Sequence, residues 1–170
     1  FENERLIGGA PLNFAWNLRQ FGFPVGMVSA VGDDELGTSL RSFIRDAGIN
    51  DLMVSVRPEP TGTVLITVAD GEPDFVINEN VAWDHIDVNS GLEDTIDLVY
   101  FGSVAQRTPH NRNALRKLLE MQCDYRLFDV NIRQHYYSTE VLLDGIRNAN
   151  IVKFNFDEWR LVRDVAEVGS

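Results

Sequence analysis

The sequence predicts an α/β protein in which helices cover a mainly parallel sheet, with a small antiparallel β-sheet added to it. Short β-rich runs alternate with helical patterns along most of the chain, which is typical of parallel strands joined by helices. Residues 54–77 interrupt this alternation: they have no helical period, and two β runs, 63–68 and 75–77, flank Asp70-Gly71. A turn signal between two β runs predicts an antiparallel hairpin.

The order of the elements follows from the spacing of apolar residues. In chain order we expect a strand at 25–31, a helix at 36–47, a strand at 96–101, a helix at 110–121, a strand at 125–130, a helix around 141–146 and a strand at 150–154. Gly32 closes the first strand, and Gly48 ends the first of these helices, as glycine commonly does. The hairpin is either an elaboration of the sheet edge or a lid that closes a site against water.

The charge of the chain excludes some classes of partner. Its 170 residues include 15 basic and 26 acidic side chains, a net charge of −11. Such a chain repels phosphate backbones, so we expect neither nucleic acid nor a membrane surface as a partner. A phosphorylated ligand must therefore be held by local N–H groups, a few cations and a metal.

The single cysteine and the apolar runs indicate a cytoplasmic protein. Cys123 has no second cysteine with which to form an internal disulfide, which fits a reducing compartment. No apolar run approaches the roughly 20 residues that span a bilayer, and no signal peptide is visible. The chain begins at Phe1 without Met, and we expect it to be incomplete at both ends.

A glycine-rich bend near the start of the chain is the first candidate site. Gly8 and Gly9 precede a helix that carries Asn13 in its first turn. Glycine lacks a Cβ, so its backbone can touch a ligand or adopt a positive φ. The N–H groups at a helix start favour polar or anionic ligands. A plain glycine-rich turn with a polar helix start accounts for the same residues equally well.

Polar residues also follow two of the predicted strands. Ligands of open parallel sheets bind beyond the carboxyl ends of the strands. Ser103 follows strand 96–101, although a plain strand-to-loop turn explains it too. Asn131 and Arg133 follow strand 125–130, and alternation places them on one side with Asp129 if the chain stays extended. The alternative is an Asp129–Arg133 ion pair that holds a loop.

A third polar cluster follows the strand at 150–154. Asn155 and Glu158 have the spacing of a capping box at a helix start. Glu158 could also help to place Mg²⁺ against phosphates, directly or through water. Both interpretations can hold together.

Several other kinds of site are absent from the sequence. His85, His110 and His135 lack the spacing of metal ligands, so we assign them no metal. The chain has neither the phosphate-binding loop of P-loop kinases nor the glycine motif of dinucleotide-binding oxidoreductases. No Ser–His–Asp arrangement is evident.

The spacing of the glycines resembles a known family. The letters GGAPLNFA at residues 8–15, followed by Gly22 and Gly32, resemble the N-terminal signature of the ribokinase-like sugar kinases, also called the phosphofructokinase-B type. Within that family, bacterial fructokinases are the most similar at residues 10–16, 82–84, 101–107 and 129–133. The resemblance implies a three-layer α/β/α fold with a mainly parallel sheet and a small β-sheet lid. It places the lid strands at about 1–7 and 54–80.

The resemblance also implies ATP- and Mg²⁺-dependent transfer of a phosphoryl group to a sugar hydroxyl. The residues implied to bind sugar are Gly8, Gly9, Asn13 and Arg133; those implied to bind phosphate are Asn131, Lys153 and Asn155; Glu158 is the implied metal contact. Phe75, if the hairpin is a lid, and Ser103, at its strand end, are the other expected sugar contacts. Alternatives are a kinase of the same fold for ribose, a sugar acid or a nucleoside, and a catalytically silent sugar-binding protein.

The chain departs from the family at both ends. Before Phe1 it lacks the first strand with its sugar-binding Asp, and after Ser170 it lacks the Gly-Ala-Gly-Asp-type segment that carries the general base. Phosphoryl transfer needs positioning, charge neutralisation and a base, so we expect these 170 residues alone to be inactive. A bare sheet edge would also favour aggregation. A second exposed face of the lid would favour a homodimer.

Overall fold

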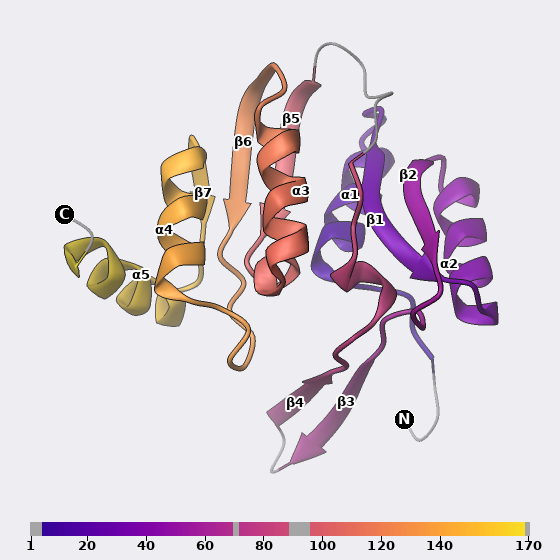
Figure 1. Ribbon diagram of the computed structural model, residues 1–170, viewed down its shortest axis with the longest axis horizontal. Coiled ribbons are helices and arrows are strands. Elements are labelled where there is room, and N and C mark those ends of the chain that lie inside the picture. The colour runs from indigo at the N-terminus through magenta and orange to yellow at the C-terminus, as the bar shows by residue number, and fades with distance from the viewer. Residues whose placement is uncertain (1–4, 70–71, 89–95, 169–170) are drawn as a thin grey trace. The chain divides into compact units, whose positions relative to one another are not determined.

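The computed structural model describes residues 5–69, 72–88 and 96–168, which fall into two compact units, 1–87 and 88–170 (Figure 1). Each unit contains its own parallel sheet, and a separate antiparallel hairpin lies in the first. The prediction of a mainly parallel α/β protein with a small antiparallel sheet is therefore confirmed. The expected turn at Asp70-Gly71 lies outside the described residues.

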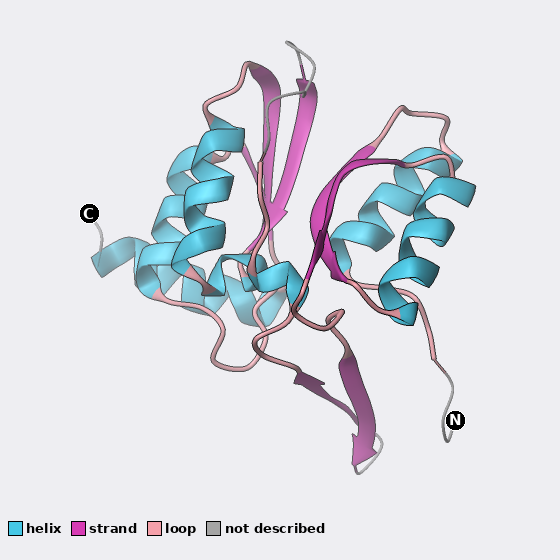
Figure 2. Ribbon diagram, turned by 45° about the vertical axis from the view of Figure 1, so that its right-hand side comes forward, coloured by secondary structure: helices cyan, strands magenta, loops and turns pink. Residues whose placement is uncertain are grey.

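The first unit begins with two strand–helix pairs. Helix α1 (Ala10–Gln20) precedes strand β1 (Gly26–Gly32), and helix α2 (Glu35–Asp46) precedes strand β2 (Asn50–Arg57), which pairs in parallel with β1. Figure 2 shows both helices beside each other on one face of these strands. Their shared core consists of Leu12, Ala15, Val31, Ile44, Ile49 and Val54. Because residues 54–57 finish β2, the lid range predicted from residue 54 begins too early.

The hairpin forms a sheet of its own. Strand β3 (Val64–Ala69) pairs antiparallel with β4 (Glu72–Ile77), with Val64 opposite Ile77, and the short 3₁₀ helix η1 (Ala82–Asp84) follows. Of the other expected lid strand, residues 5–7 form no strand, and residues 1–4 lie outside the described part.

The second unit contains a three-stranded parallel sheet in the order β5-β6-β7. Its elements are β5 (Ile96–Gly102), η2 (Val104–Arg107), α3 (Pro109–Leu119), β6 (Cys123–Asp129), α4 (Thr139–Asn148), β7 (Ile151–Lys153) and α5 (Phe156–Val168). Phe128 of β6 is fully buried, and its ring fills the space that a Cβ on Gly145 of α4 would need. The glycine thus lets α4 pack closely against the sheet.

The predicted elements agree with these bounds to within one or two residues at most ends. In the described part of the chain, none of the helices has the length and apolar character needed to cross a membrane.

Candidate functional site

The Gly8-Gly9 bend has the geometry that its sequence predicts. Gly9 precedes α1 with φ 115° and ψ 141°, a backbone conformation that strains any residue with a side chain. Nothing lies within 4 Å of the position where its Cβ would be. Both glycines are exposed, so the bend is open to a ligand rather than packed inside the unit.

The start of α1 offers backbone donors. Gly9 has no side chain with which to cap the helix, so N–H groups of the first turn are left to water or a ligand. Asn13 lies one turn into the helix, where its own N–H donates to the Gly9 carbonyl at 2.9 Å. Its side chain is exposed and lies 3.8 Å, measured from Oδ1, from where a Gly8 Cβ would be. Gly8, Gly9 and Asn13 therefore form one continuous polar surface.

The three strands of the second unit end level with one another. Gly102, Asp129 and Lys153 are register partners across β5, β6 and β7, and each is the last residue of its strand. The segments that follow the strands therefore leave from the same edge of the sheet. This edge brings together the second unit's six predicted site residues: Ser103, Asn131, Arg133, Lys153, Asn155 and Glu158.

The loop after β6 turns sharply instead of remaining extended. Asn131 has φ 37° and Gln134 has φ 47°, both in the left-handed region. The chain therefore does not stay extended after Asp129, which was the condition for alternation to place Asp129, Asn131 and Arg133 on one side. The Arg133 guanidinium donates from Nη1 to the Ile132 carbonyl at 2.8 Å.

Ser103 contacts the loop that follows β6. It is fully buried, and its hydroxyl donates to the Asn131 carbonyl at 3.4 Å. A long hydrogen bond of this kind positions the loop only weakly. The residue thus lies at the predicted edge, beneath the backbone of the next predicted site residue.

Asp129 connects the three strands at this edge. Its carboxylate, 5% exposed, accepts from the Tyr100 hydroxyl at 2.6 Å and from the Lys153 ammonium at 2.8 Å. Burial of the Tyr100 phenol raises its pKa, and the hydrogen bond to Asp129 raises that pKa further. The ion pair that the structure shows for Asp129 is thus with Lys153. The Lys153 side chain is 64% exposed, so its other N–H donors can reach a ligand.

Asn155 and Glu158 form the predicted capping box. The Asn155 side chain accepts from the Glu158 N–H at 2.8 Å, and Glu158 accepts from the Asn155 N–H at 2.9 Å. The other oxygen of Glu158 accepts from the Ile132 N–H at 2.8 Å. Glu158, 7% exposed, therefore joins the start of α5 to the loop that carries Asn131 and Arg133.

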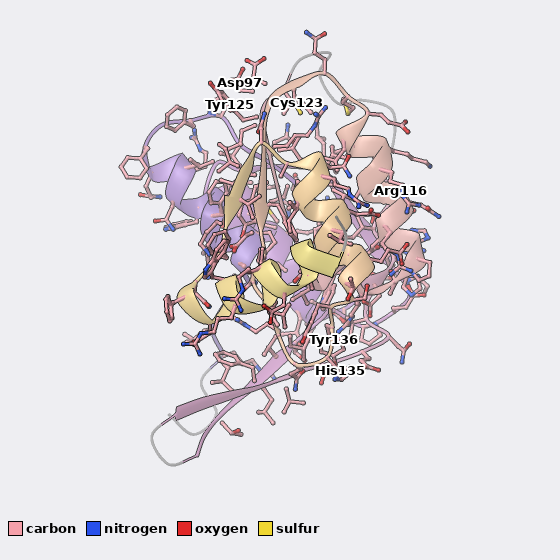
Figure 3. All side chains as sticks on the ribbon, turned by 90° about the vertical axis from the view of Figure 1, so that its left-hand side faces the viewer. Asp97, Arg116, Cys123, Tyr125, His135 and Tyr136 are labelled. Atoms are coloured by element: carbon pink, nitrogen blue, oxygen red, sulfur yellow. The ribbon has the colours of Figure 1, made fainter. Side chains whose placement is uncertain are left out.

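An aromatic cluster marks the same end of the second unit. Figure 3 shows His135 and Tyr136 there, at the end opposite Asp97, Cys123 and Tyr125. The Arg107 guanidinium lies over the Tyr136 ring, 4.7 Å from its centroid, and the His135 ring is 4.3 Å from the same ring. Such stacking holds an arginine beside the loop after β6.

The base of the hairpin contains a second carboxylate network, in the first unit. Asp34 caps α2 and accepts hydrogen bonds from Gly37 and Thr61. The Thr61 hydroxyl and N–H bonds, followed by the Gly37 N–H bond, lower the pKa of Asp34. Phe75, the predicted sugar contact of the hairpin, lies half-buried on β4 opposite Ile66.

Sequence reasoning missed the roles of Tyr100, Asp129 and Asp34. The signal for Asp34 is its position directly before α2, because Asp is a preferred N-cap. Tyr100 and Asp129 are 29 residues apart, and only the strand register brings them together.

Comparisons with known proteins identify the family. Residues 2–168 match the pfkB family of carbohydrate kinases. A sugar kinase of Pyrococcus horikoshii is 28% identical over 167 residues, which cover 91% of this chain and 54% of that protein. Fructokinase-1 of Oryza sativa subsp. japonica is 29% identical over 136 residues, covering 75% and 42% of the two chains.

Solved structures show the same fold. The Pyrococcus horikoshii sugar kinase in complex with ATP has a TM-score of 0.84 at 24% identity, covering 92% of this chain and 56% of that one. Fructokinase from Vibrio cholerae in apo form has a TM-score of 0.79 at 21% identity, covering 91% and 57%. The chain spans about half the length of the curated relatives it matches. It belongs to the pfkB family of carbohydrate kinases and has their ribokinase-like α/β fold.

Proposed function

We propose that the full-length protein is a sugar kinase that transfers the γ-phosphoryl group of ATP to a sugar hydroxyl, with fructose as the preferred acceptor. The observation that carries this proposal is the exposed Gly8-Gly9 bend at the uncapped start of α1, in a chain of this family. Several curated relatives are fructokinases, which supports fructose over other sugars.

The residues of the second unit fit ATP and Mg²⁺. Both oxygens of Glu158 already accept a backbone N–H, yet each keeps a second lone pair for water bound to a metal. Mg²⁺ commonly retains several waters and binds through one or two carboxylates and the substrate phosphates. When bound, it neutralises phosphate charge during transfer. No cluster of three or more His, Cys, Asp or Glu is found among residues 5–69, 72–88 and 96–168, which fits an ion held chiefly by ATP.

The same edge provides groups for the phosphates. Lys153, anchored by Asp129, presents a cation whose position is fixed. The Asn155 amide oxygen accepts a hydrogen bond at the helix start, and its NH₂ group, on an exposed residue, is a further donor. Asn131 and Arg133 follow in the loop that Glu158 holds. Asn131, Lys153 and Asn155 would bind and orient the phosphates of the donor. The sugar would be bound by Gly8, Gly9, Asn13, Phe75, Ser103 and Arg133.

An ATP-coupled assay of the full-length protein tests this function. We expect Mg²⁺-dependent ADP formation with fructose, and slower turnover with ribose, a sugar acid or a nucleoside. Equal rates with fructose and ribose would contradict the preference for fructose. No turnover with any of the four, combined with sugar binding by calorimetry, would favour the catalytically silent alternative.

A pair of glycine variants tests the sugar site itself. Gly9 and Gly22 lie at opposite ends of α1, both with positive φ and with no atom within 4 Å of an added Cβ. Gly9→Ala and Gly22→Ala therefore each introduce backbone strain without a steric clash, of about 1–3 kcal/mol. We expect only Gly9→Ala to raise the KM for sugar, by about tenfold. Equal KM changes in the two variants would contradict a sugar contact at Gly9.

We further propose that the protein acts in the cytoplasm and forms a homodimer through the hairpin. We also propose that residues 1–170 alone do not phosphorylate sugar, because they span only about half the length of the curated relatives. ATP-dependent phosphorylation by this stretch in the same assay would contradict that proposal.

A further inference from the structure

The base of the β3–β4 hairpin is fastened to the start of α2 by one carboxylate. We propose that Asp34 and Thr61 form a latch that fixes the orientation of the hairpin and so positions it as a lid over bound sugar. Asp34 is then a positioning residue, distinct from the groups that contact substrate. The lid role rests on the proposed function, whereas the latch itself rests on the contacts below.

The latch consists of four hydrogen bonds around the partly buried Asp34 carboxylate. The Thr61 hydroxyl donates to Asp34 Oδ1 at 2.6 Å, and the Thr61 N–H donates to Oδ2 at 2.8 Å. The Gly37 N–H also donates to Oδ1, at 2.7 Å, and the Gly32 N–H donates to the Thr61 hydroxyl oxygen at 2.8 Å. Thr61 is 8% exposed. Hydrogen bonds to an ionised acceptor are the stronger kind, so the carboxylate holds both segments firmly.

Two glycines show how closely these segments approach. A Cβ on Gly32 would lie 2.5 Å from the Thr61 nitrogen and 2.7 Å from the Glu59 carbonyl oxygen. A Cβ on Gly37 would overlap the Gly32 carbonyl and lie 2.9 Å from the Thr61 hydroxyl oxygen. The obstacles are largely backbone atoms, which cannot move aside cheaply. The close approach of residues 59–61 to the end of β1 therefore requires glycine at positions 32 and 37.

The rest of the hairpin base is held from its other side. The Ala82 N–H donates to the Pro60 carbonyl at 2.8 Å, and the Trp83 indole occupies the space where a Gly62 Cβ would be. Thr63 and Asn78 close the two strands with a backbone bond of 3.2 Å and a side-chain bond of 2.8 Å. The segments that enter and leave the hairpin are thus held together at its base.

Most of the apolar side chains that the structure describes on β3 and β4 are exposed. Val64, Leu65, Ile66 and Val76 are 43–61% exposed, whereas Phe75 is half-buried and Ile77 near the base is buried. The orientation of the strands therefore depends on their base. The latch also lies at the carboxyl ends of β1 and β2, where Gly32 and Arg57 are register partners and where ligands of parallel sheets bind.

Asp34→Ser separates the latch from the helix cap. Serine is as good an N-cap as aspartate, so it preserves the cap of α2, but its side chain is too short to hold Thr61 as well. Thr61→Val removes the hydroxyl while keeping the shape, and Thr61→Ser restores the hydroxyl. Ser138→Ala is the matched control, because it removes the cap of α4 in the other unit.

Hydrogen exchange and sugar kinetics of the full-length protein give the two measurements. We expect Asp34→Ser and Thr61→Val to speed exchange of the β3 and β4 amides by about tenfold, with α2 amides unchanged in Asp34→Ser. We expect the KM for sugar to rise by about tenfold, while kcat and the KM for ATP change less than about threefold. Thr61→Ser and Ser138→Ala should resemble the wild type in both measurements.

The two measurements test the latch and its positioning role separately. Unchanged hairpin exchange in Asp34→Ser and Thr61→Val would overturn the latch, whatever the activity. Faster exchange with an unchanged KM for sugar would overturn the positioning role. If the wild type phosphorylates no sugar, the proposed function fails while exchange still decides whether the latch exists.

Discussion

The stability of the protein depends on the individual hydrogen-bond donors to the buried Asp129 carboxylate. Tyr100→Phe removes the hydroxyl that donates to Asp129 at 2.6 Å and leaves one buried oxygen without that bond. We expect this variant to lose about 1–3 kcal/mol of unfolding free energy. Tyr125→Phe removes the same hydroxyl from a tyrosine that is 55% exposed and should be close to neutral. Urea denaturation of both variants checks the difference, and equal losses would contradict it.

At this scale, local contacts could be predicted from sequence and distant ones could not. Asn155 and Glu158 are three residues apart, so their capping box follows from helix geometry alone. The bond between Tyr100 and Asp129 depends on the register of β5 against β6, which no local pattern encodes. The positive φ of Asn131 is likewise imposed by the loop, because asparagine tolerates this conformation without requiring it.

The packing of the hairpin base on η1 sets the next prediction, at the scale of elements. A methyl group on Gly62 would overlap the Trp83 indole, whereas one on Gly26 meets nothing closer than 3.9 Å. We expect Gly62→Ala to destabilise the protein by about 1–3 kcal/mol through overpacking, and Gly26→Ala to lie within about 0.5 kcal/mol of the wild type. Thermal unfolding of the two variants measures both effects. A Gly62→Ala variant as stable as Gly26→Ala would show that the indole moves aside freely.

The start of α2 should make stability depend on acid. Hydrogen bonds from Thr61 and Gly37 lower the pKa of Asp34 from its ordinary value of 3.8. A lowered folded-state pKa stabilises the protein fully above the unfolded value, and this contribution is lost as the pH falls through the folded value. The difference in unfolding free energy between wild type and Asp34→Ser should therefore be constant above about pH 5 and shrink below about pH 4. Urea titrations across that range measure it, and a difference that grows in acid would contradict the assignment.

The boundary between β2 and the hairpin shows why element assignment was incomplete. The β runs at 63–68 and 75–77 predict β3 and β4 as strands, whereas no strand is predicted over residues 50–57, where β2 lies. The partner of each strand was not visible, and the end of β2 was therefore assigned to the lid instead of to the parallel pairing with β1. Period-2 patterning reports burial of a face, and long-range pairing decides which sheet a strand joins.

For the whole molecule, the order of the elements carried more information than any single motif. Alternating strands and helices predicted parallel sheets, and the carboxyl-end rule then placed the polar segments after β5, β6 and β7 at one edge. The register of Gly102, Asp129 and Lys153 agrees with that placement. The sequence does not predict the division into units 1–87 and 88–170, because the patterning of apolar residues is similar in the two halves and marks no boundary.

The last prediction concerns assembly and rests on two exposed apolar residues of the hairpin. Leu65 and Val76 are register partners, 61% and 43% exposed, and an apolar strand pair of this kind favours association with a second copy. We expect the full-length protein to sediment as a dimer and Leu65→Asp to sediment as a monomer. Leu52→Asp is the matched control, since Leu52 is 84% exposed on β2 and receives the same new charge away from the hairpin. A wild-type monomer at high concentration, or equal dissociation of both variants, would contradict assembly through the hairpin, because a general charge effect would act alike at the two positions.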